Sequence, residues 1–170
     1  MRTILLSLLL LPAYATSVGA APPPSSKKPS SSLCRASEQV IYDCQMDERM
    51  ASVCQTGKAI TFRFGSPENR TIQVTSDGQD GRSHQFYIRG GGRGGFSRGL
   101  RFSQDGLEFI PFVGMAGELT DVHGKKWSGL EIQKNHVSLA TQRCKVTKRD
   151  DIDIPSFVPE ETDESYLVWY

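Results

Sequence analysis

The chain has 170 residues, with 20 Lys and Arg against 19 Asp and Glu, and its formal net charge at pH 7 is +1. One of the basic residues, Arg2, lies within residues 1–20, and the rest of the chain is balanced in charge. Because a nucleic-acid-binding domain usually carries a net basic surface, this balance argues against nucleic acid as a partner.

Residues 1–20, MRTILLSLLLLPAYATSVGA, combine an early base, an apolar run and small residues. This is the pattern of a secretory signal peptide, and the run is shorter than the roughly 20 residues that a membrane-spanning helix needs. We expect cleavage after Ala20, with Ala15 as the alternative, and hence a periplasmic or secreted protein that does not span a membrane. The Pro- and Ser-rich residues 21–33 predict a disordered linker.

Four cysteines predict two disulfides in an exported chain: Cys34, Cys44, Cys54 and Cys144. None has C-x-x-C spacing, so we expect neither a metal site nor another cofactor. We favour Cys44 with Cys144, which would join an early strand to the last one, and Cys34 with Cys54. The rival pairing, Cys34–Cys44 with Cys54–Cys144, stays open. The segment 34–144 is long enough for one domain with one core.

Apolar and polar residues alternate over many short stretches of this segment, which is typical of strands with one buried face. The expected strands cover residues 40–44, 51–54, 59–64, 71–75, 84–88, 100–103, 107–113, 129–133 and 137–144. Gln104-Asp105-Gly106 predicts a hairpin turn, and Pro111 predicts an edge strand or a bulge. The fold class is therefore all-β, a small antiparallel β-sandwich or barrel with two disulfides.

The stretch Arg89–Gly99, RGGGRGGFSRG, lies between two expected strands. One interpretation is a Gly-rich loop whose arginines keep it soluble. The other is an anion-binding loop, in which Arg89, Arg93 and Arg98 bind carboxylates or phosphates. Trp127, next to two lysines, is either a further binding residue or a cap on the core.

Residues with catalytic potential are scattered. The histidines lie on separate expected elements without the spacing of metal ligands: His84, His123 and His136. The acids considered for a glycosidase-type pair share no motif: Glu108, Glu118 and Asp121. No nucleophile elbow of the type G-x-S-x-G is present. We therefore expect no catalytic residues.

Residues 145–170 form an acidic tail, in which seven acids follow Arg149 before the apolar and aromatic run Tyr166–Tyr170. Two hypotheses explain this composition. The terminal run adds as a strand to a sheet edge, of this chain or of a partner. Alternatively, the acids fold back onto the arginines of Arg89–Gly99 and mask them.

Several short motifs resemble small exported bacterial proteins of uncharacterised function: Glu38–Cys44, Ser52–Cys54, Arg63–Gly65, Gly129–Ile132 and Arg143-Cys144. A more distant likeness is to periplasmic inhibitors of C-type lysozyme, which are small β-barrels. Tyr42-Asp43-Cys44 and Cys144 resemble their layout of an aromatic-x-Cys motif early and a Cys in the final strand. Where those inhibitors carry Ser-Gly-x-x-Tyr, this chain has Ser128–Ile132.

These observations together favour an exported, non-enzymatic binding protein. Its expected partner is a protein or an anionic ligand of the envelope, and an inhibitor or immunity partner of a cell-wall-active enzyme is the class that the resemblance implies. The alternatives are a small hydrolase of an envelope polymer and a structural envelope protein. The expected contact residues are Arg89, Arg93, Arg98 and Trp127.

Overall fold

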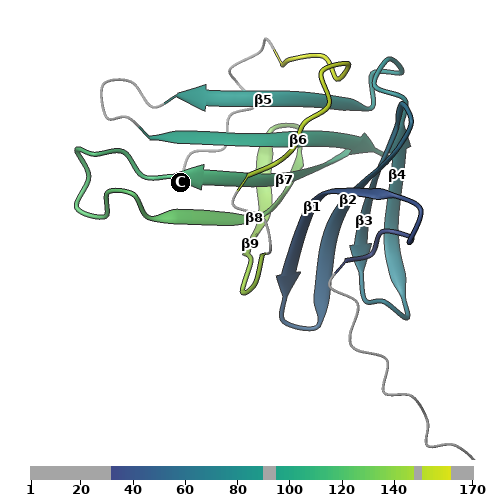
Figure 1. The fold of residues 1–170 in the computed structure, drawn as a ribbon, viewed down its shortest axis with the longest axis horizontal. Helices are drawn as coiled ribbons and strands as arrows, with labels where there is room; N and C mark the ends of the chain where they lie inside the picture. The colour runs from purple at the N-terminus through teal and green to yellow at the C-terminus, as the bar shows by residue number, and fades with distance from the viewer. Residues whose placement is uncertain (1–31, 90–94, 148–150, 162–170) are drawn as a thin grey trace, which may run out of the picture.

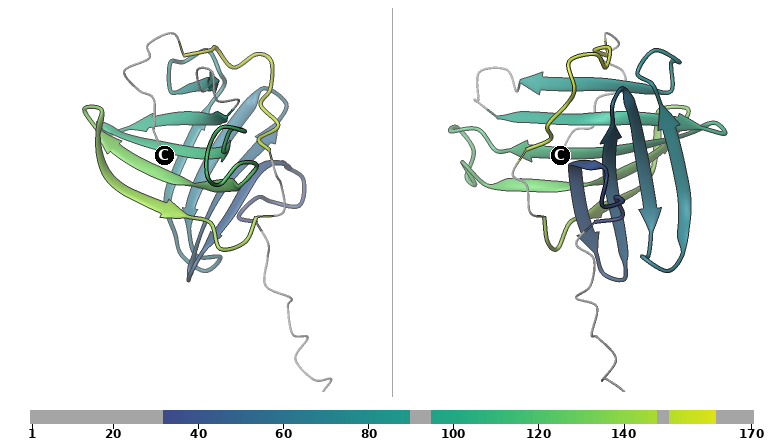
Figure 2. Two further views of the ribbon diagram at one scale, coloured as in Figure 1. Left: turned by 90° about the vertical axis from the view of Figure 1, so that its left-hand side faces the viewer. Right: turned by 45° about the vertical axis from the view of Figure 1, so that its right-hand side comes forward.

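The computed structural model describes residues 32–89, 95–147 and 151–161, and for residues 86–89 it describes the backbone alone. These parts contain nine strands and no helix, arranged in two antiparallel sheets. The strands of one sheet run across those of the other (Figure 1 and Figure 2). The all-β class is therefore confirmed, in the form of a two-sheet sandwich.

The four-stranded sheet has the order β1-β2-β3-β4 and forms by successive hairpins. Its strands are β1 (Gln39–Met46), β2 (Arg49–Thr56), β3 (Ala59–Gly65) and β4 (Arg70–Ser76). The alternation in β3 explains its orientation, because Ile60, Phe62 and Phe64 enter the core. Thr61 and Arg63 consequently point to the opposite face of the sheet.

The five-stranded sheet has the order β5-β6-β7-β8-β9. Its strands are β5 (Ser83–Arg89), β6 (Phe96–Gln104), β7 (Leu107–Met115), β8 (Lys126–Lys134) and β9 (Val137–Arg143). The turn between β6 and β7 has positive φ at both central residues, 54° at Asp105 and 74° at Gly106. This geometry matches the right-handed twist of a tight hairpin and confirms the turn predicted there.

The main core lies between the two sheets. The ring of Phe62 stacks on Phe102 and Phe109, with centroids 5.4 Å and 5.5 Å apart. The buried hydroxyl of Tyr42 donates a hydrogen bond to the carbonyl of Gly129 at 2.6 Å, which connects β1 to β8. Burial is the main cause that raises the pKa of Tyr42, so this hydroxyl keeps its proton.

Both favoured disulfides are present, Cys34–Cys54 and Cys44–Cys144. The second joins β1 to the residue that follows β9, and a bridge between Gln45 and Val146 continues the same connection. Cys44 and Cys144, which link the first sheet to the end of the second, are thus separated by 100 positions in the chain.

Two local expectations are wrong. Pro111 lies in β7, the middle strand of the five-stranded sheet, and pairs in register with Leu130 of β8. The sheet accommodates it because the β6–β7 ladder is interrupted between the pairs Gly99–Phe112 and Phe102–Phe109, where proline has no N–H to donate. Arg98 is also not in a loop, because β6 begins at Phe96.

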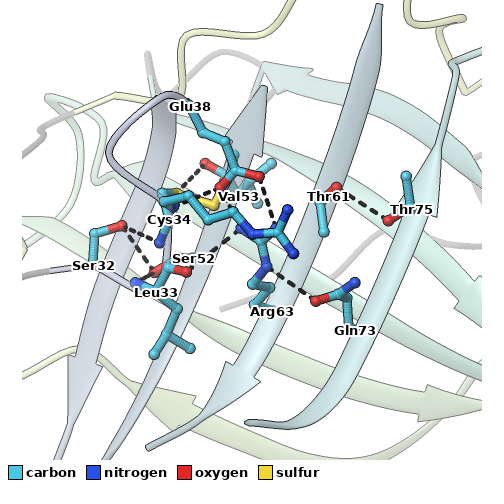
Figure 3. The surroundings of a disulfide bond; sticks show 12 residues. Ser32, Leu33, Cys34, Glu38, Ser52, Val53, Thr61, Arg63, Gln73 and Thr75 are labelled. Atoms are coloured by element: carbon cyan, nitrogen blue, oxygen red, sulfur yellow. Dashed lines mark hydrogen bonds and ion pairs between the residues drawn. A yellow bond between two sulfur atoms is a disulfide. The ribbon is translucent and has the colours of Figure 1, made fainter. Parts of the chain in front are cut away.

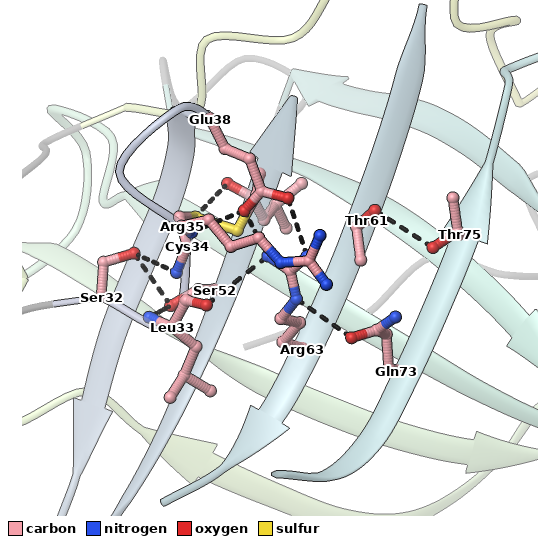
Figure 4. Close-up of polar contacts among 12 residues, drawn as sticks. Ser32, Leu33, Cys34, Arg35, Glu38, Ser52, Thr61, Arg63, Gln73 and Thr75 are labelled. Carbon is pink, nitrogen blue, oxygen red and sulfur yellow. Dashed lines mark hydrogen bonds and ion pairs between the residues drawn. A yellow bond between two sulfur atoms is a disulfide. The ribbon is translucent and has the colours of Figure 1, made fainter. Parts of the chain in front are cut away.

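The outer face of the four-stranded sheet is covered by the segment before β1. Leu33, the last residue of the expected linker, is buried there, and its N–H donates to the hydroxyl of Ser52 at 3.0 Å. The Cys34–Cys54 disulfide fixes the segment to β2 (Figure 3). Arg63 donates from Nη1 and Nη2 to the two carboxylate oxygens of Glu38, at 2.6 Å and 2.8 Å (Figure 4).

Residues 151–161 of the expected acidic tail pack onto the domain and are called the strap below. Ile152 and Val158 are buried in the main core between the sheets. The strap then pairs with the edge strand β5, where Gln85 donates to the carbonyl of Pro159 at 2.9 Å and accepts from the N–H of Glu161 at 2.6 Å. In Figure 1 the strap is the yellow segment beside β5 and β6. The core therefore extends beyond Cys144.

Candidate functional site

Arg98, one of the predicted contact residues, pairs with an acid of the strap. Its register partner is Val113, so it projects to the core side of the five-stranded sheet, near the end of β6. Nη1 donates to Oδ2 of Asp151 in the strap at 3.0 Å. Exposed fractions of 31% for Arg98 and 57% for Asp151 make this a surface ion pair. One acid of the strap therefore does meet one arginine of the Gly-rich segment.

The two other arginines are placed less completely. The backbone of Arg89 ends β5 opposite Phe96, and its side chain lies outside the described residues. Arg93 belongs to residues 90–94, which also lie outside them. Both stay predictions.

Trp127 begins β8 and lies opposite Gly114 of β7. Its indole lies directly on this glycine, because a Cβ built there would be 2.5 Å from Nε1. The guanidinium carbon of Arg143 lies 5.8 Å from the indole centroid, a cation–π arrangement. Residues that pair across a sheet share a face, so Trp127 and Arg98 project to opposite faces. They do not form one contact surface.

Trp127 belongs to the face of the five-stranded sheet that points away from the main core, called the outer face below. Next to its row lies a row centred on Phe112, which is flanked by Gly99 and Gly129. Phe112, Ile110 and Trp127 form an apolar cluster separate from the main core. At this end of the outer face, aromatic side chains therefore lie next to glycines of the neighbouring strands.

The other end of the outer face is polar and buried. Arg101 donates from Nη1 to Oε1 of Glu108 at 3.0 Å and also forms an ion pair with Glu161 of the strap. Glu131 is 1% exposed and accepts a hydrogen bond from the hydroxyl of Thr141. Burying charges of this kind is costly unless they are paired. The sheet holds them by placing acids and donors at neighbouring register positions.

Four buried side-chain atoms of the outer face make no hydrogen bond within the part of the chain that the structure describes. They are Nδ1 of His84, Oε2 of Glu108, Nε1 of Trp127 and Oε1 of Gln133. His136 approaches Glu108, with Nδ1 and Oε2 4.0 Å apart. Burial, followed by the charge of Arg101, lowers the pKa of His84, so its imidazole is neutral near pH 7. A buried polar atom normally has a hydrogen-bond partner, and four without one on a single face make this face the candidate site.

The carboxylates considered for catalysis do not assemble as a group. Glu108 lies on the outer face, whereas Glu118 and Asp121 lie in the connection between β7 and β8. Cys34, Cys54 and Glu38 come close together, yet both sulfurs belong to the disulfide and offer no thiolate to a metal.

The outer-face cluster was not found from the sequence, although one signal pointed to it. Arg101, Glu108 and Glu131 each lie between two apolar residues of a strand. Such alternation is normally interpreted as a solvated face. Only the pairing of the strands shows that these side chains lie on one face, and only the structure shows that they are buried there.

The chain was compared with protein-family models, with curated proteins and with solved structures, and none of them matches it. The described residues include no helix with the length and hydropathy to cross a bilayer. The two disulfides indicate an oxidising, non-cytoplasmic environment.

Proposed function

We propose that the protein is an exported, non-enzymatic binding protein that holds its partner on the outer face of the five-stranded sheet. The observation that carries this proposal is the set of four buried polar atoms on that face that make no hydrogen bond within the described residues. A ligand that supplies donors and acceptors would satisfy them, and their burial would make each such hydrogen bond strong.

The residues of the outer face support a partner of a particular chemistry. At its aromatic end, Trp127 is partly buried against the buried side chains of Ile110 and Phe112, and it would contact an apolar or aromatic group of the partner. Arg143, beside Trp127, adds a cation next to this aromatic end, which suits a carboxylate on the partner. An extended peptide segment of a protein, with an aromatic side chain and an acid, combines these properties. Arg89 and Arg93 remain predicted contacts.

A cell-wall-active enzyme is the partner class that we propose, and inhibition is the proposed effect. The support is the likeness in layout to inhibitors of C-type lysozyme. The Cys44–Cys144 disulfide, which joins an early strand to the end of the last one, agrees with that layout.

The test uses residues 21–170 and a C-type lysozyme, with binding measured by calorimetry and inhibition by the rate of cell-wall lysis. We expect a Kd in the micromolar range or tighter, and parallel inhibition. Arg143→Gln should weaken binding at least tenfold, because it removes the cation beside Trp127. The matched control is Lys58→Gln, which removes an exposed base on the β2–β3 turn and should change nothing. Absence of both binding and inhibition would overturn the lysozyme proposal.

One contact favours hydrolysis as a second candidate, the approach of His136 to Glu108 on the same buried face. A hydrolase would release soluble fragments from cell-wall polymer without any partner enzyme, and Glu108→Gln would abolish that release. Fragment release by the protein alone would contradict the non-enzymatic proposal.

A further inference from the structure

The strand β9 forms the border of the five-stranded sheet opposite β5 (Figure 2). Beyond β8, no described segment of the chain pairs with β9. Two other sheet edges are covered by the chain itself. Gln85 of β5 pairs with the strap, and Gln45 of β1 pairs with Val146. Because the backbone of an open edge can pair with another chain, β9 is a candidate surface for a partner.

The side chains of β9 are unusually apolar for an open edge. Val137 is 63% exposed and Leu139 is 58% exposed. Residues 137–142 include neither a charged residue nor a proline, the two residue types that commonly protect an edge. The other open edge, β4, differs because its exposed residues are all polar: Arg70, Thr71, Gln73 and Thr75. A partner at β9 would therefore gain apolar contacts as well as backbone pairing.

The backbone of β9 directs hydrogen-bonding groups to this open side. The N–H of Cys144 donates to the carbonyl of Ser128 in β8 at 2.9 Å. In an antiparallel ladder, alternate residues direct both backbone groups to the same neighbour. Gln142 therefore faces β8, whereas Thr141 and Arg143 direct their N–H and C=O groups away from it. A strand added at this edge would form backbone hydrogen bonds there.

The charges near the edge favour one occupant. Residues 134–146 place Lys134 before β9 and Arg143 at its end, and they contain no acid. Lys145, in the same range, pairs with Asp47 of the other sheet. If β9 paired with β9 of a second copy about a two-fold axis, the Arg143 end of one strand would meet the Lys134 end of the other. Like charges on paired strands are destabilising, so a segment with acids at its ends fits better.

We propose that β9 binds an extended segment of a partner protein as the sixth strand of the sheet. The segment has an apolar centre that packs on Val137 and Leu139, and acids that lie beside Lys134 and Arg143. The inference rests on the proposed function, since this strand is the extended segment of the partner that the outer face holds. Arg143 belongs to both surfaces, because its guanidinium lies over Trp127 on the outer face.

Amide NMR of residues 21–170 with a synthetic peptide tests the added strand. The probe is acetyl-Glu-Thr-Val-Thr-Val-Thr-Glu-amide, and its control has Lys in place of both Glu residues. At saturation, the acidic peptide should slow hydrogen exchange at the amides of Thr141 and Arg143 at least tenfold. The Lys peptide should bind at least tenfold more weakly. No slowing at these amides, slowing at β4 or β5 instead, or equal binding of both peptides would overturn the proposal.

A matched pair of variants tests the location without disturbing the core. Leu139→Glu places an acid on the exposed edge and should weaken binding of the acidic peptide at least tenfold. Leu119→Glu makes the same change at a residue that is 72% exposed in the connection between β7 and β8, and should leave binding unchanged. Equal affinity of Leu139→Glu and the unmodified chain would place the peptide elsewhere and overturn the proposal.

Lysozyme binding separates this inference from the proposed function. Lysozyme binding without peptide binding would overturn the added strand and leave the proposed function intact. Peptide binding at β9 without lysozyme binding would support the added strand and overturn the lysozyme partner.

Discussion

Arg63 and Glu38, 25 positions apart in the chain, form a bidentate ion pair on the side of the four-stranded sheet that points away from the main core. Their side chains are 2% and 9% exposed. Nε of Arg63 also donates to Oε1 of Gln73 at 3.2 Å, and the N–H of Arg35 donates to Glu38 at 2.6 Å. The pair therefore fixes the segment before β1 to β3, in addition to the Cys34–Cys54 disulfide.

Acid should weaken this ion pair within a defined pH range. The hydrogen bonds from Arg63 are the main cause that lowers the pKa of Glu38 from 4.5 to about 2. A carboxyl with a depressed folded-state pKa stabilises the fold above its unfolded pKa, and this contribution is lost as pH falls from about 4.5 to about 2. Its size is about 3 kcal/mol at neutral pH, from about 1.4 kcal/mol per pKa unit.

Glu38→Gln should lower the free energy of unfolding by about 2–3 kcal/mol at pH 7, since it leaves the buried Arg63 without its anion. Urea unfolding across pH 2–7 measures this. The variant should lose less stability than the wild type below pH 4.5. Glu48→Gln, on the exposed β1–β2 turn, is the matched control and should follow the wild type. Identical pH profiles for all three proteins would contradict the prediction.

Tyr42→Phe should cost about 1–2 kcal/mol, because it leaves the buried carbonyl of Gly129 without its donor. The raised pKa of Tyr42 adds an alkaline effect. Its contribution is complete below the unfolded pKa of about 10 and declines as pH rises above it. Urea unfolding between pH 8 and pH 11.5 should therefore show a steeper loss for the wild type than for Tyr42→Phe. Parallel declines would show that Tyr42 ionises freely in the folded protein.

The two disulfides should differ in their contribution to stability. Replacing Cys44 and Cys144 by Ser opens a loop with a sequence separation of 100, for which the chain-entropy model gives about 4.7 kcal/mol. The separation of 20 between Cys34 and Cys54 gives about 3 kcal/mol. Denaturant unfolding of the two double variants compares them directly. The reverse order would show that strain or residual structure outweighs loop closure.

Gly114→Ala should displace the indole of Trp127, because the new Cβ would lie 2.5 Å from Nε1. We expect a loss of about 1–3 kcal/mol and a red shift of the Trp127 emission, measured in a Trp169→Phe background. Ser97→Ala is the control, since Ser97 is the β6 residue paired with Gly114. Unchanged emission in the Gly114 variant would show that Trp127 does not rest on this glycine.

The strap should behave as part of the core. Ile152→Ala is expected to cost about 2–4 kcal/mol, because the side chain is fully buried between the sheets. Asp151→Asn removes only the exposed pair with Arg98 and should cost less than about 1 kcal/mol, an effect that salt screens further. Denaturant unfolding at two salt concentrations separates the two. Equal small losses would mean that the strap is not packed in solution.

Local patterns were sufficient for much of the fold. The alternation of Ile60, Phe62 and Phe64 marked β3, and Asp105-Gly106 marked the β6–β7 turn. The favoured disulfide pairing was confirmed as well, although the sequence left a rival pairing open. The strand alternation and the turn depend on neighbouring residues and can therefore be recognised in the sequence, whereas the Cys44–Cys144 pairing joins residues 100 positions apart.

The candidate site was less accessible, because it depends on register. Arg98 and Trp127 are both plausible contact residues in the sequence, yet the β6–β7 and β7–β8 registers place them on opposite faces. A shift of one residue would reverse a strand's faces, and the long connection between β7 and β8 does not fix their register as a tight turn would. Arg101 and Glu108 flank the β6–β7 turn, but their burial depends on contacts with distant residues, such as the ion pair between Arg101 and Glu161.

By itself, the sequence determined the all-β class, the strands and most of their turns, since period-two alternation and turn residues are local properties of the chain. The tertiary structure alone decided that Pro111 lies in a middle strand, that Ile152 and Val158 complete the core, and that buried charges gather on the outer face. Each of these depends on contacts between residues far apart in the chain, where strand order, register and burial determine which side chains meet.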